Sequence, residues 1–156
     1  MLLALNLGLI ASLKEGQILT NREISRIFDV CACRGIRYKG SIKSRICHIV
    51  LIAAFNKMPE DSVRNPYHDR KIDDRIIYTG EGRRGDQKMI RGNLVLVRQM
   101  QENFPLYLLE KKSPGKYVFL GRYKVINVKN EIQRDSDGEE RKVFIFELAK
   151  VCEQWK

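Results

Sequence analysis

Long hydrophobic runs are absent from this sequence. No apolar segment reaches the length of about 18 residues that a membrane-spanning helix requires, so we expect no membrane partner. The apolar start, residues 1–13, lacks the basic first region and the small-residue cleavage pattern of a secretory signal, and we expect a buried packing helix at residues 2–14 of a cytosolic protein. Internal repeats and low-complexity tracts are also missing, and 156 residues are most simply one domain.

Metal-ligating side chains are scarce. Cys31 and Cys33 form a C-x-C pair whose spacing differs from that of a zinc knuckle, while Cys47 and His48 lie together inside an apolar run. Cys152 is far from both in the chain. We therefore predict buried free thiols, no metal and no cofactor.

Acidic residues are outnumbered by basic ones. The chain has 19 Asp and Glu against 29 Lys and Arg, which gives a net charge of +10 and a pI near 9.6. Such a balance indicates an anionic partner, nucleic acid among them. Residues 30–59 contain no acidic side chain and six basic ones: Arg34, Arg37, Lys39, Lys43, Arg45 and Lys57.

The first half of the chain shows one clear helix signal. Thr20 followed by Glu23 makes a capping box, and Ile24, Ile27 and Phe28 then fall on one helix face. Residues 34–45 contain two glycines and five of the basic side chains, which predicts a mobile basic loop. The apolar run 46–55 predicts a central strand buried on both faces, followed by a loop at residues 56–74.

The second half is dominated by strand patterns. A short strand leads into Thr79, a helix is expected at residues 92–103, and strands are expected at residues 106–112, 116–129 and 142–151, separated by turns. This order predicts an α+β domain built on a curled β-barrel, with an N-terminal helical lobe at residues 1–30, the barrel at residues 31–156, and flanking helices.

Polar and aromatic residues gather around the strand that ends at Thr79. Tyr67 and Asp69 precede Tyr78 by a short interval, so two rings and a carboxylate arrive from adjacent loops. Two aromatic rings can sandwich a planar base, and a carboxylate can accept a hydrogen bond from an exocyclic amine such as N4 of cytosine. On the residues alone, half-buried sheet tyrosines and a turn aspartate remain an alternative.

A family signature covers the same residues. The segments Tyr78-Thr79-Gly80-Glu81-Gly82 and Gly85-Asp86-Gln87-Lys88, with Asn93 downstream, resemble the YTG-x-G, DQ and N signature of SRA domains (SET- and RING-associated, also called YDG). In sequence, residues 19–30, 35–41, 67–69 and 141–151 resemble the SRA-like module of prokaryotic modification-dependent HNH restriction endonucleases. The similarity extends from about Leu19 to Val151.

The resemblance implies a PUA-like, crescent-shaped barrel that flips a cytosine out of duplex DNA. It assigns base stacking to Tyr67 and Tyr78, reading of the cytosine amine to Asp69, and contact with the 5-substituent to Thr79, beside Gly80. The sequence departs from eukaryotic SRA domains in two places. The first tyrosine is one residue closer to Asp69, and the long finger after YTG-x-G is replaced by the short Arg83-Arg84 pair. We therefore expect recognition of 5-modified cytosine in a looser context than a hemimethylated CpG.

Flipping costs a few kcal/mol, and each stacked aromatic returns roughly 1–3 kcal/mol, so net affinity must come largely from phosphate contacts. We expect Arg37 or Tyr38 to enter a groove and fill the gap that the base leaves. The predicted contacts to the DNA backbone or groove are Arg34, Arg37, Tyr38, Lys39, Lys43, Arg45, Arg83, Arg84, Lys88 and Arg91.

We expect a binding module with no catalytic residues. It would be the targeting part of a modification-dependent restriction system, associated with the nucleoid in a prokaryotic cytoplasm. His48 and His68 are too few for an H-N-H motif, so a nuclease domain or subunit is the expected partner beside modified double-stranded DNA. The alternatives are a PUA-like module for RNA or N6-methyladenine, a small metal-dependent nuclease using the D-x-K spacing of Asp86 and Lys88, and a structural interaction domain. The preferred 5-substituent, the flanking bases and the oligomeric state stay open.

Overall fold

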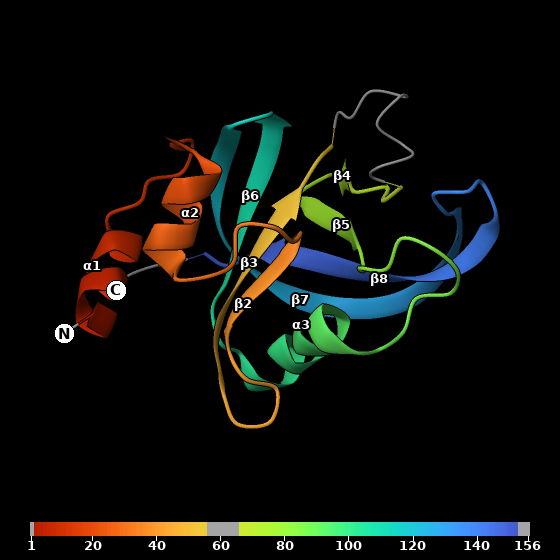
Figure 1. The fold of residues 1–156 in the computed structure, drawn as a ribbon, viewed down its shortest axis with the longest axis horizontal. Helices are drawn as coiled ribbons and strands as arrows, with labels where there is room; N and C mark the ends of the chain where they lie inside the picture. Colours follow the sequence, from red (N-terminus) through yellow and green to blue (C-terminus); the bar gives the residue numbers. More distant parts are fainter. Residues whose placement is uncertain (1, 56–65, 153–156) are drawn as a thin grey trace.

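The computed structural model describes residues 2–55 and 66–152 (Figure 1). Three helices and eight strands follow one another along this part of the chain. In order they are α1 (Leu2–Ala11), β1 (Ile18–Leu19), α2 (Asn21–Phe28), β2 (Ile36–Gly40), β3 (Ile46–Ala53), β4 (Arg70–Ile72), β5 (Arg75–Thr79), α3 (Arg91–Glu102), β6 (Leu106–Ser113), β7 (Lys116–Arg134) and β8 (Glu140–Lys150).

One large sheet contains all the strands. Its order is β2-β3-β6-β7-β8-β5-β4, with β1 paired to the start of β7, and β3 and β6 run parallel while the other neighbours are antiparallel. The long strand β7 joins the two halves, because its first part pairs with β6 and its second part with β8. The expectation of a mixed α+β fold around a large curled sheet is confirmed (Figure 1).

The sheet is curled but not closed, which corrects the expectation of a barrel. Among the described residues, the end strands β2 and β4 do not pair with each other. Register shifts between Leu108 and Leu109 and between Val125 and Asn127 bend the strands, and Gly121 adopts φ of 103° close to the first shift. Bulges of this kind increase the twist of a sheet, so the strands curl without meeting.

Helix α2 forms as predicted. Thr20 is its N-cap, and both hydrogen bonds of the capping box with Glu23 are present. Its buried face, Ile24, Ile27 and Phe28, packs against one side of the sheet. The helix therefore covers the face of the sheet next to β3, β6 and β7 (Figure 1).

Helix α1 is less buried than its composition suggests. Leu5 is 62% exposed and Leu7 is 55% exposed, while Asn6 and Ile10 face inward. The expectation of a buried helix is therefore wrong for its described side chains. A run that is apolar on every side must leave some of these side chains in solvent when a single neighbour covers it.

The prediction of a mobile basic loop at residues 34–45 is wrong for five of its twelve residues. Residues Ile36–Gly40 form β2 and pair with β3, with Ile36 only 1% exposed. The strand forms because β3 would otherwise leave one edge of backbone groups unpaired. Only the turn at residues 41–45 matches the expected loop.

Most of the other predicted elements are confirmed, with small differences. The strands β3, β5, β6, β7 and β8 and the helix α3 fall where their patterns placed them, although β7 is longer than expected. Strand β4 was not foreseen and lies in the predicted loop at residues 56–74, of which residues 56–65 lie outside the described part. Strand β1 was not foreseen either.

The four cysteines lie at the surface of the protein. Cys31, Cys33, Cys47 and Cys152 are all exposed, so the prediction of buried thiols is wrong. His48 is the buried member of its pair with Cys47, because alternate residues of β3 point to opposite faces. In the described part of the chain, no helix is both long and apolar enough to cross a membrane.

Candidate nucleic-acid interface

A cavity of about 870 Å³ opens where the ends of β3 and β5 meet the start of β2 and the glycine-rich loop, residues 80–90. Most of the predicted site residues line it, although they come from distant parts of the chain. These are Tyr67, Asp69, Tyr78, Thr79, Gly80, Arg34, Arg37, Arg83, Arg84, Lys88 and Arg91. Tyr38, Lys39, Lys43 and Arg45 do not line the cavity, because β2 carries them away from it toward the turn at residues 41–45.

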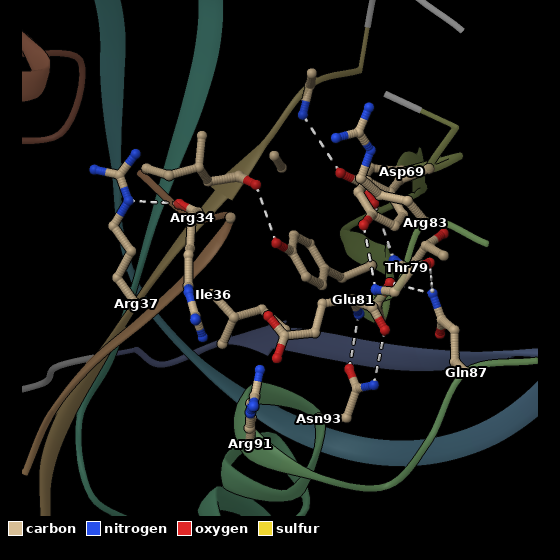
Figure 2. A pocket seen from close by; sticks show the side chains of 18 of the residues that line it. Arg34, Ile36, Arg37, Asp69, Thr79, Glu81, Arg83, Gln87, Arg91 and Asn93 are labelled. Atoms are coloured by element: carbon tan, nitrogen blue, oxygen red, sulfur yellow. Dashed lines mark hydrogen bonds between the residues drawn. The ribbon is translucent and has the colours of Figure 1, made fainter. Parts of the chain in front are cut away.

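The carboxylate of Asp69 is held in the cavity wall by two backbone amides. Its Oδ1 accepts a hydrogen bond from the Thr79 amide at 2.9 Å, and its Oδ2 accepts one from the Ala54 amide at 3.5 Å (Figure 2). The side chain is 8% exposed. These two bonds orient the carboxylate in the wall of the cavity.

Tyr78 reaches the cavity from the sheet. It is 4% exposed, belongs to the main hydrophobic core, and donates its hydroxyl to the Ile52 carbonyl at 3.1 Å. Burial, with a smaller effect from the Asp69 charge, raises the pKa of Tyr78 well above its ordinary value, so the phenol stays neutral. A Cβ on Gly35 would lie 3.0 Å from this hydroxyl, so glycine leaves room for the ring.

Tyr67 lines the same cavity from the segment before β4. Its side chain is partly buried, and its hydroxyl accepts a hydrogen bond from the Gly82 amide at 3.2 Å. Burial is the main cause that raises the pKa of Tyr67. The two tyrosines thus border one cavity, one from the sheet and one from the segment before β4, with Asp69 in the same wall.

The glycine-rich loop is held by two amide side chains. Gln87 donates to the carbonyls of Gly80 and Gly82, at 2.5 and 3.2 Å, and accepts from the Phe144 amide at 2.9 Å. Asn93 exchanges two hydrogen bonds with the Glu81 backbone, at 2.8 and 3.0 Å. A Cβ on Gly80 would lie 2.6 Å from Asn93 Oδ1 and 2.8 Å from Gln87 Oε1. The glycine, glutamine and asparagine of the signature therefore shape the loop.

Asp86 also has a structural partner. Its Oδ1 accepts a hydrogen bond from the Lys142 amide at 2.8 Å, which ties the loop to β8. Within residues 2–55 and 66–152, no group of three or more His, Cys, Asp or Glu side chains is arranged to hold a metal ion. Asp86, the aspartate of the D-x-K spacing, therefore lies in the glycine-rich loop and has a structural role as the acceptor for the Lys142 amide.

Sequence reasoning missed two residues of the site. The Glu81 carboxylate accepts from the Gly92 amide at 2.8 Å at the start of α3, and Glu81 lines the cavity next to Gly80 (Figure 2). Asn21, at the start of α2, accepts a hydrogen bond from Arg37 at 2.6 Å and also lines the cavity. Glu81 lies inside the recognised signature and could have been noted. Asn21 carries no local signal, because only the packing of α2 brings it here.

Arg37 differs from the other basic residues of the site. It is 4% exposed and donates to the Arg34 carbonyl at 2.5 Å and to Asn21. It is therefore fixed in β2, where a mobile groove-reading loop was expected. The exposed cations that line the cavity and were among the predicted DNA contacts, named here the basic rim, are Arg34, Arg83, Arg84, Lys88 and Arg91.

The chain is similar to a known domain family and to several solved structures. The family model described as "ScoMcrA-like, SRA domain" matches residues 33–156. No curated protein matches. Among solved structures, the SUVH5 SRA domain bound to methylated CHH DNA is similar at 22% identity and a TM-score of 0.68, covering 93% of each chain.

Two further structures are similar in fold. The SUVH5 SRA domain bound to fully hydroxymethylated CG DNA has 22% identity and a TM-score of 0.67, again over 93% of each chain. The sulfur-binding and SRA domains of ScoMcrA, complexed with phosphorothioated DNA, have 21% identity and a TM-score of 0.69 over 90% of this chain and 40% of that one. At these identities the likeness shows the shared fold.

Proposed function

The chain belongs to the ScoMcrA-like SRA domain family, and from this premise we propose that it recognises 5-modified cytosine in duplex DNA by flipping the base into the cavity. Tyr67 and Tyr78 contact the flipped base, Asp69 accepts a hydrogen bond from its amine, and Thr79 borders its 5-substituent. The observation that carries the proposal is the Asp69 carboxylate, oriented by two backbone amides in a cavity bordered by two tyrosines.

The depth and charge of the site support this assignment. A base enclosed by protein loses its water, so a buried acceptor such as Asp69 discriminates strongly between a base that offers a matching donor and one that does not. Stacking on two aromatics and the cost of flipping are of similar size. The basic rim supplies the remaining affinity by contacting phosphates on either side of the flipped nucleotide.

The similar structures support a restriction context. ScoMcrA is described as a Type IV phosphorothioation-dependent restriction endonuclease, and this chain covers 28% of it. We propose that the chain is the targeting part of such a system in a prokaryotic cytoplasm. It acts as one DNA-binding domain without chemistry of its own, together with a nuclease domain or subunit.

The test is a binding titration at physiological salt on four duplexes that differ at one position. That position carries cytosine, 5-methylcytosine, 5-hydroxymethylcytosine or N6-methyladenine. We expect at least one 5-modified cytosine to bind more tightly than plain cytosine and N6-methyladenine. Equal binding to all four duplexes would refute the proposal. Tightest binding to N6-methyladenine would show that the domain recognises a methylated adenine in place of a modified cytosine.

Variants of Asp69 test whether the cavity is where modified cytosine is distinguished from plain cytosine. Asp69→Asn keeps the size of the side chain but turns one acceptor into a donor, and we expect it to remove the preference while leaving weak, salt-dependent binding. Asp74→Asn is the matched control, because its side chain is 90% exposed and does not line the cavity. An unchanged preference in Asp69→Asn would show that Asp69 does not read the base.

A further inference from the structure

Two cysteines lie close together on the loop that connects α2 to β2. Cys31 and Cys33 are both exposed, and the chain bends at Ala32 and Cys33. In an extended chain, Cα atoms two residues apart are separated by about 7 Å. A bend shortens this separation toward the range of about 4.4–6.8 Å that a disulfide requires. The C-x-C pair is therefore placed where its two sulfur atoms can meet.

The backbone of this loop is held by one connected set of hydrogen bonds. Asn21 Nδ2 donates to the Ala32 carbonyl at 2.5 Å, and Arg37 Nε donates to the Arg34 carbonyl at 2.5 Å. Arg37 Nη1 also donates to Asn21 Oδ1 at 2.6 Å, so the two anchors support each other. The backbone around the C-x-C pair is thus fixed, while both cysteine residues remain exposed.

The surroundings of Cys31 favour its thiolate. Partial desolvation raises the pKa of the Cys31 thiol, but hydrogen bonds from the amide and the thiol of Cys33, the positive charge of Arg37 and a hydrogen bond from the Arg34 amide outweigh this effect. The pKa of Cys31 therefore lies below its ordinary value. The thiolate is the form that reacts with oxidants, so Cys31 reacts more readily than an ordinary exposed thiol.

The C-x-C pair borders the cavity that we assign to the base. Ala32, Cys33 and Arg34 all line this cavity, and Arg34 belongs to the basic rim. Cys47 on β3 and Cys152 after β8 are exposed as well, but they are not among the residues that line the cavity. A chemical change at the C-x-C pair therefore alters the surface that would meet DNA.

We propose that Cys31 and Cys33 are a redox-sensitive pair, which a hydroperoxide oxidises to an intramolecular disulfide, and that this disulfide weakens DNA binding. The effect on DNA rests on the proposed function, whereas the oxidation does not. Disulfides in cytosolic proteins are commonly transient and redox-sensing, which suits an exposed pair of this kind.

The oxidation takes place in two steps. The Cys31 thiolate attacks one oxygen of the hydroperoxide, the O–O bond breaks, and Cys31 becomes a sulfenic acid while water or an alcohol leaves. The Cys33 thiol then attacks the Cys31 sulfur, the S–O bond breaks, the S–S bond forms, and water leaves. Two thiols are oxidised and one peroxide is reduced. With hydrogen peroxide, both thiol protons end in the two water molecules that form.

The disulfide acts on DNA binding through the backbone. It closes a small ring around Ala32, which turns the Ala32 carbonyl away from Asn21 and changes the direction of the chain that enters Arg34. Arg34 then loses its phosphate contact. One lost contact predicts about fivefold weaker binding. Modified and plain duplexes should weaken by the same factor, because the proposed base-reading residues lie outside this loop.

Mass spectrometry tests the oxidation. The protein is treated with equimolar hydrogen peroxide, the remaining thiols are alkylated, and the chain is digested with trypsin. Residues 27–34 form one tryptic peptide that contains Cys31 and Cys33 and no other cysteine. We expect this peptide to lose two hydrogen atoms and to escape alkylation, while Cys47 and Cys152 are alkylated. Equal oxidation of all four cysteines, or disulfides between chains, would overturn the proposal.

Binding titrations on the oxidised and reduced proteins test the effect on DNA. The variant Cys47→Ser with Cys152→Ser is the matched control, because it removes two exposed thiols and keeps the C-x-C pair. Peroxide should weaken its DNA binding about fivefold, and dithiothreitol should restore it. Cys31→Ser and Cys33→Ser cannot form the disulfide, so peroxide should leave their affinities unchanged.

The outcomes separate the inference from the proposed function. If the disulfide forms and the affinity for DNA stays the same, control of binding by the C-x-C pair is refuted. If peroxide weakens Cys31→Ser as much as the unaltered protein, the effect arises at another group and the proposal fails. If the reduced protein binds modified and plain duplexes equally, the proposed function fails, and the oxidation of the C-x-C pair is decided by the peptide masses alone.

Discussion

Asp69 and Thr79 are ten positions apart in the chain, and the hydrogen bond from the Thr79 amide to the Asp69 carboxylate places the proposed base-reading group beside the residue proposed to border the 5-substituent. The same bond explains why a carboxylate occurs at this position. Aspartate accepts from two backbone amides, which neither alanine nor lysine could do. At the scale of single residues, the side chain that we propose to read the base is thus also the one that supports the local backbone.

Tyr78 has two functions that substitutions can separate. Its hydroxyl bonds the Ile52 carbonyl, while its ring lines the cavity. We expect Tyr78→Phe to lower stability by about 1 kcal/mol, a shift of about 2–4 °C in Tm, and to retain base flipping. Tyr78→Leu should reduce flipping. A 2-aminopurine probe next to the modified cytosine measures this, and an unchanged fluorescence signal in Tyr78→Leu would contradict a role of the ring in stacking.

His48 predicts a dependence of stability on pH. Burial lowers the pKa of His48 below its ordinary value of 6.5, against an opposing effect of its 2.7 Å hydrogen bond to the Phe28 carbonyl, while Lys39 lowers and Asp29 raises the pKa to smaller extents. The folded protein therefore binds a proton at His48 less readily than the unfolded chain does. Its contribution to stability is complete above pH 6.5 and is lost as the pH falls through and below this value.

Thermal unfolding at pH 7.5 and at pH 5.5 tests this directly. We expect a lower Tm at pH 5.5, and a smaller decrease in His48→Gln, which keeps a donor for the Phe28 carbonyl but does not titrate. Equal decreases in both proteins would assign the pH dependence to other groups.

At the scale of elements, the glycine-rich loop is the part of the site that is fixed from several sides. Gln87 and Asn93 hold its backbone, Asp86 ties it to β8, and Arg141 donates to two of its carbonyls. This support holds Arg83 and Arg84 among the residues that line the cavity. The loop therefore presents two exposed positive charges beside the cavity.

The loop arginines yield a prediction about salt dependence. Arg83→Gln with Arg84→Gln should weaken binding to modified and plain duplexes by the same factor, and should reduce the slope of log affinity against log salt by about 2. Titrations at several salt concentrations measure the slope. Lys124→Gln with Lys129→Gln on β7 is the matched control, because these exposed lysines do not line the cavity. A selective loss of modified DNA in the arginine variant would instead assign base reading to this loop.

At the scale of the whole molecule, only some of the basic residues lie next to the cavity. The net charge is +10, but the cavity is bordered by the five exposed cations of the basic rim, while Lys39, Lys43 and Arg45 lie elsewhere. Lys39 is moreover paired with Asp29 at 3.1 Å. We therefore expect long-range attraction to DNA to come from the whole surface and direct phosphate contacts to come from the rim.

The rim predicts how affinity for plain duplex responds to salt. If each of its five cations meets one phosphate, affinity should fall roughly 500-fold between 50 and 200 mM salt. The ratio between modified and plain duplexes should stay constant, because base reading in the cavity does not release counterions. A ratio that changes with salt, or a nearly flat titration for plain DNA, would contradict this division.

Several elements could be predicted from short stretches of the sequence. The capping box of α2, the strands β5 to β8 and the helix α3 follow from periodicity and cap residues that lie within a few positions of each other. Tyr67, Asp69, Tyr78 and Thr79 could be named as a group because the spacing of one signature connects them. The meeting of these four residues in one cavity agrees with that expectation.

Other features were decided only when distant segments came together. Strand β2 exists because β3 offers it an edge, and Arg37 is buried because α2 places Asn21 against it. Gln133 and Arg141 become neighbours through the register of β7 and β8, which no pattern within either segment signals. The sequence by itself determined local conformation and the signature residues, because these depend on nearby side chains. Burial, register and unmet hydrogen bonds depend on what packs across the sheet, and only the tertiary structure decided them.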